Sequence, residues 1–113
     1  MKRLSRKQIY ELVYEANYDE VGLWLIIGKI QIELGVSEPA ELMDVTLQAV
    51  KDLLETGEVV TGEYEYAADG SVHFHRWGTD SEQIVNRIQE KWHALGRTPD
   101  IGEVVTFVGP ERM

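Results

Sequence analysis

The spacing of the apolar residues changes at Glu58 from a helical period to strict alternation. Up to Gly57, three segments carry apolar side chains three and four residues apart, the spacing of one face of a helix. Over residues 60–77 apolar and polar residues alternate, which is typical of a strand with one buried face. A further segment with helical spacing follows between Thr79 and Gly96. The sequence therefore predicts an α+β fold.

Capping residues mark where the helices should begin and end. Ser5 and Gln8 have the spacing of a capping box, and so do Thr79 and Glu82. Glycine after an apolar segment favours a helix end, because it adopts the left-handed conformation without strain. Four helices are expected on these grounds: from Arg6 to Asn17, from a cap at Asp19 or Glu20 to Gly35, from Ser37, Glu38 and Pro39 to Gly57, and from Thr79 to Gly96.

Apolar stripes indicate which sides of these helices are buried. The second helix is apolar on nearly every side, so its neighbours should enclose it. The third has a single stripe, made of Met43, Thr46, Leu47, Val50, Leu53 and Leu54. Tryptophan at helical spacing is usually part of a hydrophobic core. We therefore expect Trp24 and Trp92 to be buried in the core.

The alternating segment predicts a β-hairpin. Val60, Gly62, Tyr64 and Tyr66 alternate with Thr61, Glu63 and Glu65; Val72, Phe74 and Arg76 alternate with His73, His75 and Trp77. Asp69 and Gly70 between them favour a tight turn, within a loop at residues 68–71. The apolar tail over residues 104–108 is expected to form a last strand or an extended segment, with its pairing to the hairpin left open.

With 113 residues, the chain is expected to form one domain over residues 1–113, with a body at 6–77 and a C-terminal helix and tail at 78–113. The absence of cysteine favours a reducing compartment, and we expect a cytoplasmic protein. The longest apolar run, at residues 21–27, is too short to cross a bilayer. Polar residues after the basic start argue against a signal peptide.

The passage from the third helix into the hairpin, residues 47–60, resembles the join between recognition helix and wing in the winged-helix superfamily. The resemblance covers residues 6–77 and implies a winged-helix-like fold: three helices, then a β-hairpin, here followed by a fourth helix and a short extended tail. The segment at residues 96–105, Gly-Arg-Thr-Pro-Asp-Ile-Gly-Glu-Val-Val, is similar to one in small uncharacterised bacterial proteins, and it implies no activity.

The superfamily resemblance implies DNA binding through the third helix and the hairpin, but the charge there is unsuitable. Residues 38–77 contain two basic side chains, Lys51 and Arg76, against nine acidic ones, and the whole chain has a net charge of −9. A tight DNA complex usually neutralises several phosphates with Lys and Arg. The charge therefore argues against DNA binding and favours a protein partner. The alternative is a transcriptional regulator that binds DNA as a dimer through its basic N-terminal arm.

Catalytic and metal-binding patterns are weak in this sequence. His73 and His75 lie two apart on one strand and face the same way, but two-residue spacing of histidine is common by chance and no further ligand motif supports it. We therefore assign them to a solvated face of the hairpin. Ser5 and Ser37 are expected to cap helices, and no nucleophile motif surrounds either. No catalytic activity, cofactor or metal is predicted.

Aromatic side chains on the hairpin, surrounded by acids, have the composition of a protein-binding surface. We predict a non-enzymatic interaction module that binds a basic protein partner, one version being an immunity or inhibitor protein against a cationic toxin or nuclease. A homodimer is left open, with Trp92 and Leu95 as contact residues. The predicted binding residues are Glu55, Glu63, Tyr64, Glu65, Tyr66, Asp69, Phe74 and Trp77.

Overall fold

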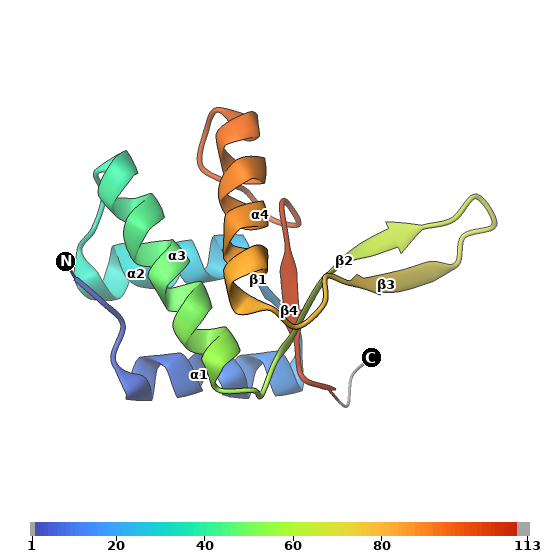
Figure 1. Ribbon diagram of the computed structural model, residues 1–113, viewed down its shortest axis with the longest axis horizontal. Coiled ribbons are helices and arrows are strands. Elements are labelled where there is room, and N and C mark those ends of the chain that lie inside the picture. The colour runs from blue at the N-terminus through green and yellow to red at the C-terminus, as the bar shows by residue number, and fades with distance from the viewer. Residues whose placement is uncertain (1, 111–113) are drawn as a thin grey trace.

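A computed structural model of the chain describes residues 2–110, in which four helices and a four-stranded antiparallel sheet form an α+β fold (Figure 1). In chain order the elements are α1 (Arg6–Tyr18), β1 (Val21–Gly22), α2 (Leu23–Leu34), α3 (Pro39–Glu55), β2 (Val60–Tyr66), β3 (Val72–Arg76), α4 (Ser81–Leu95) and β4 (Thr106–Val108). The strand order in the sheet is β1-β4-β2-β3. None of the helices within residues 2–110 is both long and apolar enough to cross a membrane.

The start of the second helix differs from the expectation. Asp19 is the C-terminal cap of α1, and Val21 and Gly22 form the short strand β1 before α2 begins at Leu23. Val21 is fully buried and pairs with Phe107 of β4. The expected cap at Asp19 or Glu20 was wrong, because pairing with a distant strand replaces the first helical turn. The expected end is confirmed: Gly35 has φ 67°.

Two other helix starts are shifted by one residue. The side chain of Glu38, and not that of Ser37, caps α3 by accepting hydrogen bonds from the backbone N–H groups of Ala40 and Glu41. These bonds to backbone N–H groups lower the pKa of Glu38. Asp80, and not Thr79, caps α4. The capping box of Ser5 and Gln8 on α1 and the left-handed Gly96 after α4 are both confirmed.

Helix α3 is enclosed on several sides, because α1, α2 and α4 all pack against it. Seven of its seventeen residues are buried. The predicted stripe was therefore too narrow: Leu42, Val45 and Ala49 are buried as well, whereas Met43 and Leu54 are only partly buried. A single stripe describes a helix with one packed face, and α3 has more than one.

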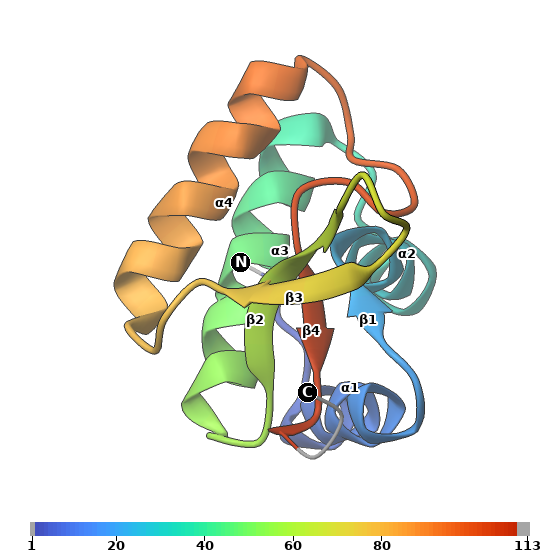
Figure 2. The same cartoon turned by 90° about the vertical axis from the view of Figure 1, so that its right-hand side faces the viewer.

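The tail forms strand β4, which lies in the middle of the sheet (Figure 2). It pairs with β1 on one side and with β2 on the other, so Phe107 stands between Val21 and Thr61. Phe107 is fully buried. The C-terminal segment therefore contributes a central strand to the sheet. Through its two pairings, β4 connects β1, which lies between α1 and α2, to the base of the hairpin.

The two tryptophans assigned to the core have different surroundings. Trp92 on α4 is buried, as predicted. The prediction for Trp24 was wrong, since 39% of this residue is exposed on the first turn of α2. Its indole ring lies over Gly22, where a Cβ atom would come within 2.7 Å of Cδ1. Trp24 thus lies outside the core, packed over the last residue of β1, a strand that the helical pattern did not reveal.

The loop from α4 to β4 is held by one carboxylate. Glu103 accepts two hydrogen bonds of 2.6 Å from the guanidinium of Arg97 and one of 2.7 Å from the backbone N–H of Asp100. The Arg97 bonds, followed by the Asp100 bond, lower the pKa of Glu103 to about 2. Val104 comes next with φ 71°, the one non-glycine residue with positive φ among residues 2–110. This strained step turns the chain into β4.

The ion pair in this loop predicts a particular pH dependence. Because the pKa of Glu103 falls from 4.5 to about 2 on folding, its stabilising effect is complete above about pH 4.5 and is lost as the pH falls towards 2. We expect Glu103→Gln to flatten the decrease in free energy of unfolding between about pH 5 and about pH 3, measured by urea denaturation. Glu58→Gln, the same charge change outside the loop, is the control. Equal slopes for wild type and Glu103→Gln would contradict the assignment.

A second prediction concerns the strain at Val104. Val104 and Val105 are adjacent and both buried, so replacing either with glycine removes a similar side chain. Only Val104→Gly also relieves a positive φ, which costs a β-branched residue about 1–3 kcal/mol. We expect Val105→Gly to lower the free energy of unfolding by at least about 1 kcal/mol more than Val104→Gly does. Equal losses in thermal or urea unfolding would show that position 104 carries no such strain.

Candidate protein-interaction site

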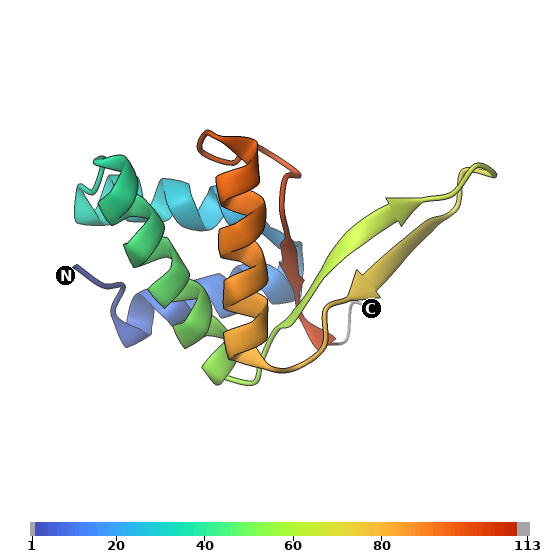
Figure 3. The same cartoon turned by 45° about the horizontal axis from the view of Figure 1, so that its top comes forward.

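The hairpin of β2 and β3 projects from the body as an arm (Figures 1 and 3). At its base, Val60 and Thr61 pair with β4, and Gly62 pairs both with Thr106 of β4 and with Arg76 of β3. From residue 63 onward, β2 pairs with β3 alone. The outer half of the hairpin therefore exposes both faces, and Tyr66 is 76% exposed. The predicted hairpin and its loop are confirmed.

The strand register separates the predicted binding residues onto two faces, because residues directly opposite each other in an antiparallel pair share a face. Tyr64 lies opposite Phe74, and Tyr66 lies opposite Val72. We call these four residues the aromatic face. On the other side, Glu63 and Glu65 lie opposite His75 and His73, and we call these four the charged face. Aromatic and acidic side chains thus point in opposite directions from the hairpin.

The aromatic face is ordered by a glycine. A Cβ atom at Gly62 would overlap the carbonyl oxygen of His75 and lie 2.7 Å from Cζ of Phe74, so the Phe74 ring covers this position. The ring of Tyr64 meets Phe74 edge to face, with centroids 5.2 Å apart and planes at 67°. Beyond this pair, Tyr66 and Val72 extend the face towards the turn, and 49% of Val72 is exposed. The result is a preformed apolar surface on an arm.

At the base of the charged face, Glu63 fastens the hairpin to α4. Its carboxylate forms ion pairs with Lys91 and, at 3.5 Å, with Arg87, and it accepts a 3.0 Å hydrogen bond from Nε1 of Trp77. The Arg87 guanidinium lies 4.1 Å from the centroid of the Trp77 ring. Burial raises the pKa of Glu63, but the bonds from Lys91 and Trp77 and the charge of Arg87 outweigh burial, so the net pKa is lowered. Glu63 and Trp77 therefore have intramolecular roles.

The remaining predicted acids are scattered. Glu65 forms a 2.6 Å ion pair with His75, and both side chains are exposed. Asp69, in the turn, accepts hydrogen bonds from the hydroxyl and the backbone N–H of Ser71, and these bonds lower its pKa. Glu55 lies on α3, in a hollow that it shares with Arg3, Arg6 and Tyr10, among others. Only Glu65 and Asp69 thus belong to the outer part of the hairpin.

His73 and His75 lie on the exposed charged face, as the alternation of apolar and polar residues in the sequence predicted. In the part of the chain that the structure describes, no group of three or more His, Asp or Glu side chains is arranged to hold a metal ion.

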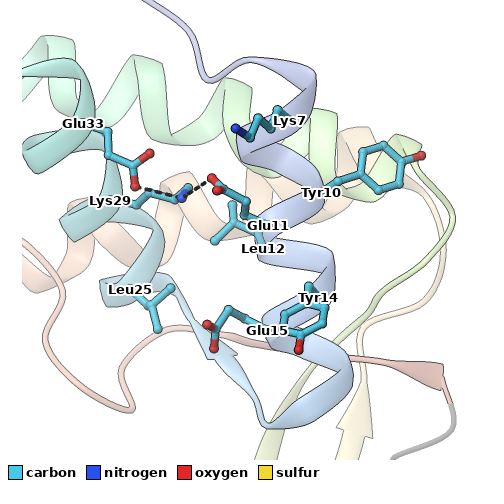
Figure 4. A pocket seen from close by; sticks show the side chains of 9 residues that line it. All are labelled: Lys7, Tyr10, Glu11, Leu12, Tyr14, Glu15, Leu25, Lys29 and Glu33. Carbon is cyan, nitrogen blue, oxygen red and sulfur yellow. Dashed lines mark hydrogen bonds and ion pairs between the residues drawn. The ribbon is translucent and has the colours of Figure 1, made fainter.

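A groove of about 760 Å³ between α1 and α2 was not anticipated from the sequence (Figure 4). Near its centre, Nζ of Lys29 lies 2.9 Å from Glu11 and 2.8 Å from Glu33. Burial lowers the pKa of Lys29, but its bonds to Glu33 and Glu11 outweigh this effect and raise it. Lys29, Glu11 and Glu33 thus satisfy one another at the centre of the groove.

The sequence interpretation also missed three exposed tyrosines on α1. Tyr10, Tyr14 and Tyr18 are 42%, 61% and 69% exposed. Their i, i+4, i+8 spacing is visible in the sequence and places them on one side of a helix. On α4, Arg87 and Lys91 have the same spacing, which could have indicated a basic stripe facing the hairpin.

No protein-family model, curated protein or solved structure matches this chain.

The close contact at Gly62 gives a testable prediction. We expect Gly62→Ala to lower the free energy of unfolding by about 1–3 kcal/mol, because the new methyl group overlaps the His75 carbonyl and the Phe74 ring. The matched control is Gly28→Ala within α2, where a Cβ atom meets nothing within 4 Å. This variant should leave stability unchanged or raise it by up to about 1 kcal/mol, because alanine favours the helix. A loss at Gly28 equal to that at Gly62 would contradict the contact.

Proposed function

We propose that this chain is a non-enzymatic protein-interaction module whose hairpin binds a basic protein partner. The observation that carries the proposal is the aromatic face of Tyr64, Tyr66, Val72 and Phe74, presented on a projecting arm. Tyrosine combines a large apolar ring with a polar hydroxyl and loses little conformational entropy when it is immobilised. A cluster of such residues at the centre of a contact is the usual composition of a binding hot spot.

Charge defines the class of partner. The chain has a net charge of −9, and the outer part of the hairpin carries Asp69 in its turn and Glu65 on the face opposite the aromatic face. Acidic groups around an apolar centre speed up the association of a basic protein and repel nucleic acid. Glu63 is half-buried beside Lys91, whereas Glu65, which pairs with His75, and Asp69, which accepts hydrogen bonds from Ser71, lie exposed on the outer hairpin where a partner can reach them. An immunity or inhibitor protein against a cationic toxin or nuclease is one version of this proposal.

The winged-helix resemblance also belongs to the proposal. Three helices and a hairpin follow one another in the order of that superfamily, with β1 between the first two helices. In a DNA-binding member the third helix would enter the major groove. Here α4 packs on α3, and the exposed charged residues of α3 are three acids and one lysine, namely Glu41, Asp44, Lys51 and Glu55.

The alternative function, a DNA-binding regulator, relies on the basic arm. Two of its four cations already have intramolecular partners: Nζ of Lys2 lies 2.7 Å from the carbonyl oxygen of Leu34, and Arg3 forms two hydrogen bonds with Asp52. This leaves Arg6 and Lys7 for phosphate contacts, fewer than a tight complex needs. The protein partner is therefore the better-supported proposal.

The proposal is tested by site-specific photo-cross-linking in cells of the native host. A p-benzoyl-phenylalanine residue at Tyr66 should cross-link a basic protein, and the same residue at Ile32 on α2, which is 85% exposed, should not. With the partner then purified, Tyr66→Ala should weaken binding at least about tenfold, whereas Ile32→Ala should have no effect. The affinity should also fall as salt is added.

Several outcomes would overturn this proposal. Equal cross-linking from positions 32 and 66 would contradict the site, and unchanged affinity for Tyr66→Ala would exclude the aromatic face. A shift of random-sequence duplex DNA by micromolar protein, lost in Arg6→Ala/Lys7→Ala, would favour the regulator instead.

A further inference from the structure

The three tyrosines of α1 form a stripe on the side of the helix that faces away from the core. The buried residues of this helix are Ile9, Leu12, Val13 and Ala16, which occupy the opposite side. We call Tyr10, Tyr14 and Tyr18 the tyrosine stripe. The rings of Tyr14 and Tyr18 contact each other with centroids 4.8 Å apart, and Tyr10 and Tyr14 also border the α1–α2 groove (Figure 4). An outer helix face normally carries charged residues, so this stripe needs an explanation.

The charges along α1 run opposite to the direction that its dipole favours. Arg6 and Lys7 occupy the first turn, which contains no acid, whereas Glu15, Asp19 and Glu20 lie at or just beyond the last turn, which contains no base. A helix is stabilised by acids near its N-terminus and by bases near its C-terminus. Within residues 2–110, no ion pair joins Arg6, Lys7, Asp19 or Glu20 to another side chain. Arg6 does lie over the Tyr10 ring, 5.7 Å from its centroid, but the fold of one chain over residues 2–110 provides no opposite charge for any of these four residues.

We infer that two copies of this chain associate through α1, antiparallel and about a two-fold axis at Tyr14. In that arrangement Tyr14 meets its own copy, and Tyr10 packs beside Tyr18 of the second copy. At 1.5 Å per residue, Tyr10 and Tyr18 each lie about 6 Å from the axis, so the stripe matches itself. The contact is isologous, with the same surface used on both subunits.

The same arrangement explains the charges. Arg6 and Lys7 lie seven or eight residues before Tyr14, and Asp19 and Glu20 lie five or six residues after it. At about 1.5 Å per residue, reversing the helix leaves these two groups about 1.5–4.5 Å apart in height along the helix, a difference that lysine and arginine side chains can span. The N-terminal end of each α1, which carries partial positive charge, also lies beside the C-terminal end of the other α1, which carries partial negative charge. A basic partner would be repelled by Arg6 and Lys7, and an acidic one by Asp19 and Glu20, so a second copy satisfies both ends.

This dimer is independent of the hairpin and of its proposed partner. The first test is sedimentation velocity of the whole chain over a range of concentrations. The mass should rise to twice the 12.9 kDa of one chain, and added salt should weaken the association. Tyr14→Glu places two like charges on the axis and should weaken association at least about tenfold. Tyr66→Glu, the same change on the hairpin, is the control and should leave the dimer unchanged.

A charge-exchange experiment distinguishes the antiparallel pairing from a general effect on folding. Arg6→Glu/Lys7→Glu makes both ends of α1 acidic, and Asp19→Lys/Glu20→Lys makes both ends basic. Each change improves the match between charges and helix dipole, so both variants should stay folded by circular dichroism. Alone, each should be monomeric. Mixed in equal amounts, they should form a heterodimer, because the acidic ends of one chain meet the basic ends of the other.

The inference fails if the wild-type chain remains monomeric up to about 1 mM, because the dissociation constant of the dimer would then lie above about 1 mM. It also fails if Tyr14→Glu dimerises as well as wild type does, or if the mixture of folded charge variants stays monomeric. A dimer that Tyr66→Glu disrupts and Tyr14→Glu does not would place the contact on the hairpin instead.

Discussion

The pairing of β4 on both of its edges is the constraint on which the other elements depend. Phe107 is fully buried between Val21 and Thr61, and these pairs connect three distant parts of the chain. Burying a phenylalanine side chain stabilises a fold by about 1.5–3 kcal/mol, and the backbone hydrogen bonds to β1 and β2 are added to that. Without β4, the hairpin would have a free edge at its base and β1 would have no strand to pair with. The Arg97–Glu103 pair and the left-handed Val104 direct the chain into this position.

This constraint also determines which surfaces remain for binding. Because β4 occupies the edge of β2 at residues 60–62, the base of the hairpin is fixed in the sheet and only its outer half extends into solvent. The α4 helix that precedes β4 packs on α3 and covers part of its surface. In the proposed function the hairpin therefore takes over recognition. The ion pairs of Glu63 with Arg87 and Lys91 connect this inner part of the hairpin to α4.

Features that depend on neighbouring residues were predictable from the sequence. The capping box at Ser5 and Gln8, the left-handed Gly35 and Gly96, and the alternation within the hairpin each reflect interactions over a few residues. The missed features depend on distant contacts. Residues 21–22 form a strand because residues 106–107 lie beside them, and no local pattern contains that information.

The candidate site shows the same division. Alternation correctly separates Tyr64 and Tyr66 from Glu63 and Glu65, because the side-chain period of a strand is two. The sequence could not show that Glu63 is paired within the chain, since its partners, Arg87 and Lys91, reach it only through the packing of α4 beside the hairpin. A count of charges treats every acid as available to a partner. The structure shows that Glu63 is partly buried against α4, whereas Glu65 and Asp69 are exposed on the outer hairpin.

The two proposed surfaces differ in the source of their specificity. The hairpin combines an apolar centre with negative charge, so it discriminates between partners by the sign of their charge. The α1 surface carries both signs at opposite ends and is complementary to itself when reversed, so it selects by symmetry. Because the surfaces lie on different elements, one association does not require the other. If both form, each dimer presents two hairpins, and a partner with two copies of its basic site would be held more tightly than one hairpin allows.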